Sequence, residues 1–235
     1  MIYKPVSLTE SQIGKYVDIN GDGIPEGVIF ADLAIGADSL WNGTPNTRYR
    51  YEKSSKELKE YIVVRTYVHS LNGKQEMLAP ILDGEDRFYI MALKDINSKE
   101  YYWYMSAFSK KMPDYEETTL EVFGSGKQNT SNMIEKWNSE SYGEQNAGLY
   151  GLDMGGIIQT QVNDGWFIPS IREWSAFAQN IGITHSNYSY KRLSPWYWSS
   201  SQYDEISAWA IDFPANDLLN EGTHTTFSIR LAKTI

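Results

Sequence analysis

The sequence lacks cysteine entirely, since none of its 235 residues is Cys. This absence excludes disulfide frameworks, cysteine-ligated zinc sites and thiolate nucleophiles. Histidine is almost as scarce, and His69, His185 and His224 are too far apart in the sequence to form a short metal-binding motif. We therefore expect no zinc centre and no cofactor.

Basic residues are outnumbered by acidic ones. The chain has 21 Lys and Arg against 30 Asp and Glu, which gives a net charge of -9 and a pI near 4.9. Such a surface repels phosphate backbones and anionic lipid head groups. Nucleic acid is therefore not expected as a partner.

Long hydrophobic runs are also missing. No stretch approaches the roughly 18 apolar residues of a membrane-spanning helix, so no membrane insertion is expected. Residues 1–5 lack the apolar core of a signal peptide. Three routes stay open: the protein remains inside its cell, leaves it by another way such as phage lysis, or has been cut from a longer chain.

Aromatic residues, by contrast, are abundant. Seventeen Tyr, eight Trp and eight Phe make up 14% of the chain, and many Ser, Asn and Gly residues accompany them. This mixture is typical of surfaces that recognise ligands. Because no internal repeat, heptad pattern or linker interrupts the chain, we expect one α+β domain over residues 1–235.

The first half of the chain reads as strands separated by polar turns. Residues 16–19 and 27–31 flank the turn-forming run 20–23 and predict a β-hairpin. Residues 36–59 are too polar for a core strand and are expected to form a surface excursion. The β-branched and aromatic runs predict further strands at 61–68, 87–93 and 101–105.

Three helices are predicted after residue 130. Asn132 resembles the cap of the first helix, and apolar residues share one face of the second over 154–162. Ser170 and Glu173 form a capping box at the start of the third helix, which ends before Gly182.

The last forty residues return to strand. Residues 196–201 predict one strand, and the alternation of apolar side chains over 209–213 and 227–231 predicts two half-buried strands that face each other. Residues 214–225 show no periodicity and are expected to form a loop.

One motif has metal-ligand spacing. Asp18, Asn20 and Asp22 have the D-x-N-x-D-G spacing that opens a calcium loop. The twelfth position holds Ile29 in place of the closing Glu, so a plain hairpin turn is favoured. Glu26 could complete an irregular site, and calcium binding therefore stays open.

No catalytic constellation is evident. The chain has no G-x-S-x-G motif, and residues 124–127 fail as a phosphate loop because the next residue is Gln128 and not Ser or Thr. Paired carboxylates can hydrolyse glycosides. The candidates, all in polar segments that read as solvated loops, are Asp114, Glu116, Glu117, Asp204 and Glu205.

Nine stretches carry a resemblance to a known family: 16–23, 27–33, 86–93, 164–170, 173–174, 196–201, 208–209, 213 and 229–231. In their order and spacing they resemble the C-type lectin-like domains of bacterial and phage proteins, especially the variable proteins of diversity-generating retroelements. The resemblance implies a C-type lectin-like fold, with mixed antiparallel sheets, two to three helices and long loops.

The resemblance also implies how the surface is used. In that family a reverse transcriptase copies a template repeat with errors at adenines and replaces the 3′ end of the gene, so that chosen surface codons vary. Trp209, Phe213, Phe227, Ile229 and Leu231 would then form the fixed scaffold of a diversified segment at about 203–228. The implied ligand contacts are Tyr203, Asp204, Glu205, Ile206, Ala210, Asp212, Pro214, Asn216, Leu219, Asn220, Glu221, His224, Thr225 and Ser228.

The expected function is therefore non-enzymatic ligand binding by a phage tail tip or a bacterial surface adhesin. The partner would be a protein or glycan receptor on a target cell, and the anchors would be Tyr203, Leu218 and Leu219. Homo-oligomers are left open. The calcium-binding triplets of animal C-type lectins and the cysteines of the similar formylglycine-generating enzymes are both missing, so neither activity is carried over.

Two alternatives are kept beside this expectation. A fixed-specificity carbohydrate-binding module of the same fold would stack sugars on Trp196 and Trp198, although alternating strand aromatics are more often core with one exposed partner. A hydrolase that uses paired carboxylates is less favoured.

Overall fold

The protein is described here by a computed structural model that covers residues 4–5, 11–20, 22–32, 40–41, 44–45, 67–71, 74–79, 86–104, 119–139 and 152–235. The chain forms two compact units. The first comprises residues 1–93, 176–182 and 232–235, and the second comprises residues 94–175 and 183–231. The single domain expected from the sequence stays a prediction.

The first unit contains an antiparallel sheet with the strand order β15-β8-β3-β2. Its strands are β2 (Tyr16–Val17), β3 (Gly27–Asp32), β8 (Phe88–Ala92) and β15 (Ala232–Thr234). Tyr16 lies opposite Val28, which confirms the predicted hairpin. The apolar core of this sheet consists of Val17, Ile29, Phe88, Ile90 and Ile235.

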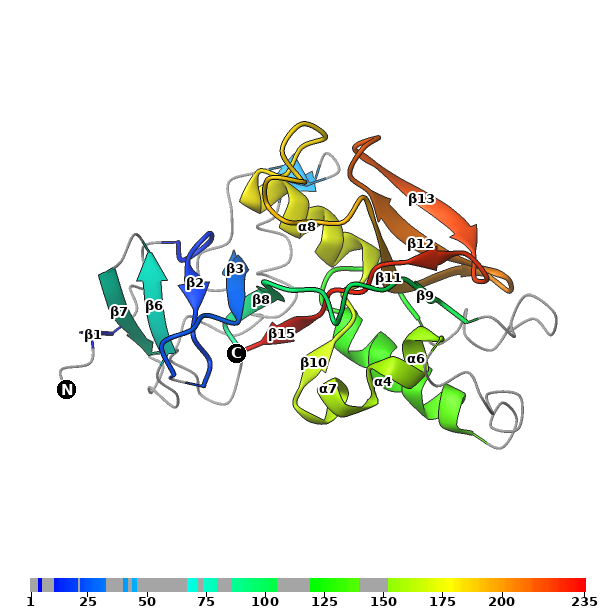
Figure 1. The fold of residues 1–235 in the computed structure, drawn as a ribbon, viewed down its shortest axis with the longest axis horizontal. Helices are drawn as coiled ribbons and strands as arrows, with labels where there is room; N and C mark the ends of the chain where they lie inside the picture. The colour runs from blue at the N-terminus through cyan, green and yellow to red at the C-terminus, as the bar shows by residue number, and fades with distance from the viewer. Residues whose placement is uncertain are drawn as a thin grey trace. The chain divides into compact units, whose positions relative to one another are not determined.

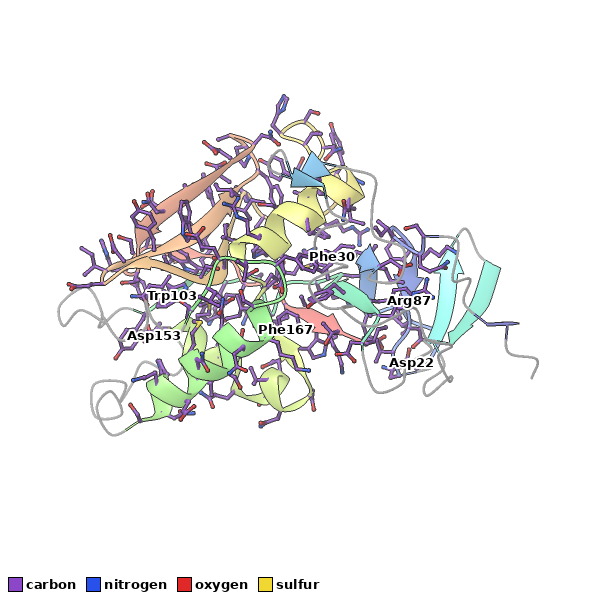
Figure 2. The ribbon with its side chains drawn as sticks, turned by 180° about the vertical axis from the view of Figure 1, so that it is seen from behind. Asp22, Phe30, Arg87, Trp103, Asp153 and Phe167 are labelled. Carbon is purple, nitrogen blue, oxygen red and sulfur yellow. The ribbon has the colours of Figure 1, made fainter. Side chains whose placement is uncertain are left out.

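A buried ion pair joins the ends of β3 and β8. Arg87 Nε donates to Asp32 Oδ1 (2.8 Å) and the Arg87 NH2 group donates to Oδ2 (2.9 Å), with both side chains buried. Arg87 is labelled in Figure 2 together with Phe30, whose ring meets the edges of Tyr89 and Phe177. Because the pairing is bidentate, it fixes the orientation of the two strands as well as their distance.

The remaining strands of the first unit are short. One sheet has the order β1-β7-β6, and β4 pairs with β5. Their bounds are β1 (Lys4–Pro5), β4 (Leu40–Trp41), β5 (Thr44–Pro45), β6 (Tyr67–Leu71) and β7 (Lys74–Ala79). The strand predicted at 61–68 overlaps β6 at its last two residues, and residues 61–66 lie outside the described residues, as does most of the predicted surface excursion at 36–59.

The second unit is built on the antiparallel sheet β11-β12-β13, in which β13 is an edge strand (Figure 1). Helix α4 packs against β11, on the side opposite to β13. The strands of this unit are β9 (Tyr101–Tyr102), β10 (Trp166–Phe167), β11 (Trp196–Asp204), β12 (Ser207–Asp212), β13 (Asp217–Gly222) and β14 (Thr226–Phe227).

The predictions for the C-terminal strands are partly wrong. The predicted loop contains β13, because Asn216 adopts a left-handed conformation (φ 56°) and the Asp212 carboxylate accepts the Ala215 N–H (2.7 Å), which reverses the chain after β12. The two strands expected to face each other do not pair. β12 lies between β11 and β13, whereas Phe227 of β14 lies opposite Tyr101.

Helix α8 (Ile171–Ile181) confirms its prediction. The Ser170 N–H donates to Glu173 Oε2 (2.7 Å), and the Glu173 N–H donates to Ser170 Oγ (3.2 Å), which is a reciprocal capping box. Gly182 ends the helix in the left-handed conformation (φ 66°).

The other two helix predictions need correction. α4 (Gly126–Asn138) begins six residues before the predicted cap Asn132, because the Glu173 carboxylate accepts the N–H groups of Gly124 (2.9 Å) and Gly126 (3.3 Å) and so sets its start. The helix predicted over 154–162 is divided at Ile158 into α6 (Met154–Ile157) and α7 (Gln159–Asn163).

Tryptophan side chains fill the core of the second unit, and three of them place the indole N–H against a backbone carbonyl of a distant segment. Trp174 Nε1 donates to the oxygen of Trp198 (3.1 Å). Trp103 Nε1 donates to the oxygen of Ser199 (2.9 Å), and Trp198 Nε1 donates to that of Tyr101 (2.8 Å). Asp153, which is labelled with Trp103 in Figure 2, forms a β-bridge with Tyr102 and accepts a hydrogen bond from Trp137 Nε1 (3.4 Å). Because the N–H of each indole has a hydrogen-bond acceptor, the ring can be buried at little cost in free energy.

The protein is thus a mixed α+β structure with several antiparallel sheets and few helices. Within the described residues no helix has both the length and the apolar character needed to cross a membrane.

Candidate ligand-binding face

The alternation of side chains along β12 decides which face of the sheet is exposed. Ala208 and Ala210 are fully buried and face the core, where Ala210 lies opposite Trp198 of β11. Trp209 points to the other face and is only half-buried. The resemblance implied that Trp209 is scaffold, and that assignment stays a prediction.

Two aromatic side chains meet on this face. The Tyr203 side chain is 48% exposed, and its ring meets Trp209 edge to face with centroids 5.0 Å apart. Trp209 Nε1 donates to Glu121 Oε1 (2.7 Å). The hydrogen bond fixes the indole ring, so the aromatic pair has a defined orientation before any ligand arrives.

The segment that carries Glu121 is itself held against the sheet. Ser201 Oγ donates to the Leu120 carbonyl (2.8 Å), and the Arg172 N–H donates to the Glu121 carbonyl (3.2 Å). Arg172 also lies 3.9 Å from Glu121 Oε2, so it partly neutralises that carboxylate. Leu120 and Val122 expose 55% and 50% of their surface beside it.

The predicted contact residues fall into three groups by exposure. Exposed are Tyr203, Pro214, Asn216, Asn220, Glu221 and His224, and half-buried are Asp204, Glu205, Ile206, Asp212, Leu219 and Thr225. Ala210 and Ser228 are buried, so their assignment to the contact surface is wrong. Ala210 faces Trp198, and the Ser228 carbonyl accepts the Trp198 N–H (3.2 Å).

The structure does not bring all the predicted contacts together. Residues 203–207 lie beside the end of β13, since Ser207 is opposite Gly222 and the Thr223 N–H donates to the Ile206 carbonyl (2.9 Å). Residues 212–217 lie at the other end of β12, about 17 Å away for a six-residue strand. We call the first group, which consists of Tyr203, Asp204, Glu205, Trp209, Asn220 and Glu221, the aromatic end of the sheet.

A buried polar network holds the opposite end of β11. Asp95 accepts hydrogen bonds from Arg230 Nε (2.6 Å), the Tyr197 hydroxyl (2.9 Å) and Ser194 Oγ (3.1 Å). Burial raises the pKa of Tyr197 to about 12. The network is structural, because it ties β11 to the segment that follows β14.

The predicted sugar platform is not formed. Trp198 is fully buried, whereas Trp196 is 38% exposed and stacks on Phe227 with ring centroids 6.0 Å apart. The interpretation of this cluster as core with one exposed partner is confirmed. A carbohydrate-binding module would therefore need another platform.

Two of the five carboxylate candidates, Asp204 and Glu205, lie in the part of the chain that the structure describes. Asp114, Glu116 and Glu117 lie outside the described residues. Asp204 uses Oδ1 to accept the Ile206 N–H (2.9 Å), which caps the turn between β11 and β12.

The calcium-like motif brings three carboxylates together. Oxygen atoms of Asp18, Asp22 and Glu26 lie within 4.8 Å of one another. Asp18 Oδ2 accepts the Gly23 N–H (2.6 Å), and Asn20 Oδ1 accepts the Asp22 N–H (2.9 Å). Oxygen ligands suit calcium, but the same atoms cap the hairpin turn, so calcium binding stays a hypothesis.

Comparison with known proteins gives little further information. No family model and no curated protein matches the chain. A solved structure of a fimbrial protein from Bacteroides ovatus ATCC 8483 is similar, with a TM-score of 0.44 and 10% sequence identity. The match covers 96% of this chain, which spans about half (49%) of the length of that protein.

Sequence reasoning missed Trp209, Glu121 and Arg172. The signal for Trp209 was present in the two alanines that flank it, because Trp198 needs small residues opposite it in the core. No local pattern could have identified Glu121, which lies 88 positions from its tryptophan partner.

Proposed function

We propose that this chain is a non-enzymatic ligand-binding protein of C-type lectin-like fold, whose β11–β13 sheet presents a surface diversified by a retroelement. The protein would act at a phage tail tip or on a bacterial surface and bind a protein or glycan receptor of a target cell. The observation that carries the proposal is the exposed aromatic pair Tyr203 and Trp209 on a sheet whose opposite face is buried.

The backbone of this sheet does not depend on its exposed side chains. All six residues of β12 pair with β13, and Ala208 and Ala210 seal the core side. Exposed residues such as Tyr203 and Asn220 can therefore be exchanged without loss of the strands. This is the arrangement that a variable binding surface on a rigid scaffold requires.

Sequencing many natural copies of the gene and its flanking DNA tests the proposal. Within codons 203–225, we expect adenine-derived substitutions at the codons of exposed residues and none at the codons of Ala208, Ala210 and Phe213. We also expect a template repeat in the flanking DNA. Exposed residues of α4, such as Lys127 and Glu135, serve as the matched control and should not vary.

The contrary result is equally definite. Variation spread evenly along the gene, or absent from codons 203–225, would remove the retroelement account. A binding module of fixed specificity would then be the better explanation of the aromatic pair.

A further inference from the structure

The residues from Tyr203 to Ser228 carry charge of one sign only. This stretch has five carboxylates, Asp204, Glu205, Asp212, Asp217 and Glu221, and no Lys or Arg. Among the described residues, no Lys or Arg makes an ion pair with Asp204 or Glu221. The surface therefore keeps a negative potential that a partner can meet.

The carboxylate of Asp204 is oriented in advance. Its Oδ1 accepts the Ile206 N–H, and the Gln202 amide donates to the Asp204 carbonyl (2.6 Å), so both side chain and backbone are fixed at the turn. A carboxylate that is held in place loses little conformational entropy when it binds. Its Oδ2 can then receive a donor from a partner.

The aromatic end of the sheet combines these charges with two π faces. Asp204 and Glu205 follow Tyr203 directly in the chain, and Asn220 of β13 is the cross-strand partner of Trp209. Arginine and lysine bind carboxylates and also stack on aromatic rings. A neutral sugar would use the rings but not the charges.

We propose that the partner of the aromatic end is a cationic protein surface, whose Arg or Lys side chains contact Tyr203 and pair with Asp204. The proposal rests on the proposed ligand-binding function and adds the chemistry of the partner to it. Electrostatic complementarity of this kind gives specificity and a fast association rate.

Random peptides displayed on phage, selected against the full chain at 50 mM NaCl and then synthesised, provide the probe. We expect the selected peptides to be rich in Arg and Lys. The variant D204N should weaken their binding about fivefold. It removes one charge, while the amide oxygen introduced at position 204 can still accept the Ile206 N–H and cap the turn.

The other end of the same sheet supplies the matched control. The variant D212N removes one charge from the same hairpin, and its amide oxygen can still accept the N–H group of Ala215. It should change peptide affinity less than twofold. Unchanged melting temperatures show that each variant is folded.

The outcomes separate the two proposals. Neutral or acidic peptides whose binding is abolished by Tyr203→Ala would overturn the cationic partner and keep the binding face. Equal weakening by both charge variants would also overturn it, since net charge alone would then explain the binding. If no selected peptide depends on Tyr203, the binding face and the cationic partner fail together.

Discussion

The Tyr197 hydroxyl is buried in the second unit and donates to Asp95, which also accepts from Arg230. Burial raises the pKa of Tyr197 to about 12 from its ordinary value of 10.0. The folded protein thus holds this proton more tightly than the unfolded chain does.

Stability should therefore fall at high pH. Above pH 10 the unfolded chain releases the Tyr197 proton while the folded protein keeps it until about pH 12, so unfolding becomes more favourable as the pH rises. We expect the wild type to lose about 2 kcal/mol more than Tyr197→Phe between pH 10 and pH 12. Urea unfolding followed by circular dichroism at pH 8 to 12 measures the difference.

Tyr190 is the control for this prediction, because it is 87% exposed. Tyr190→Phe should leave the pH profile as it is in the wild type. If the free energy of unfolding fell with pH equally in the wild type and in Tyr197→Phe, burial would not raise the pKa of Tyr197.

At the scale of elements, one buried carboxylate serves two helices. Glu173 caps α8 through the Ser170 N–H and accepts the Gly124 and Gly126 N–H groups at the start of α4. A negative charge at two helix N-termini is favourable because it meets unpaired N–H donors. Gly126 has to be glycine, since a Cβ there would lie 2.1 Å from Glu173 Oε2 and 2.8 Å from the Ser170 nitrogen.

We expect Glu173→Gln to cost about 3 kcal/mol of the free energy of unfolding. The amide group of glutamine would place N–H donors against backbone N–H donors in a buried site. Urea unfolding measures the loss, and Glu135→Gln on the exposed side of α4 should change stability by less than about 0.5 kcal/mol. Equal effects of the two substitutions would show that Glu173 does not join the helices.

At the scale of the whole molecule, the proposed function assigns fold and recognition to different faces of one sheet. The core face of β12 consists of small residues packed on tryptophan, and the other face carries the aromatic pair. Side chains on the exposed face can change without a change in core volume.

A library of the full chain tests this division. Simultaneous randomisation of Tyr203, Asn220, Glu221 and His224, all of them exposed, should leave most members folded, with melting temperatures within about 5 °C of the wild type. Resistance to protease on a display platform identifies the folded members. A library in which most members unfold would show that these residues belong to the scaffold.

Ala210 gives the opposite expectation and completes the test. Ala210→Leu should cost about 1–3 kcal/mol, because the site is fully buried against Trp198 and the added volume has no room. A melting temperature equal to that of the wild type would contradict the assignment of this face to the core.

The sequence by itself determined those features whose partners are near in the chain. The β2–β3 hairpin and the Ser170–Glu173 capping box could be predicted because their hydrogen bonds join residues a few positions apart. Composition likewise determined that residues 203–228 are acidic, since they hold five carboxylates and no Lys or Arg. These are local or additive properties, so no knowledge of the fold was needed.

Only the tertiary structure decided the features that depend on distant partners. α4 begins at Gly126 because a carboxylate 47 positions away accepts its N–H, and Trp209 is oriented by a glutamate 88 positions away. Trp198 on the neighbouring strand decides which face of β12 is buried. The sequence alternates in the same way for both faces, so only the side chains that pack on each face distinguish them. The sequence pattern of a strand shows that every second side chain is buried. The packing of the whole unit decides which of the two sets of side chains this is.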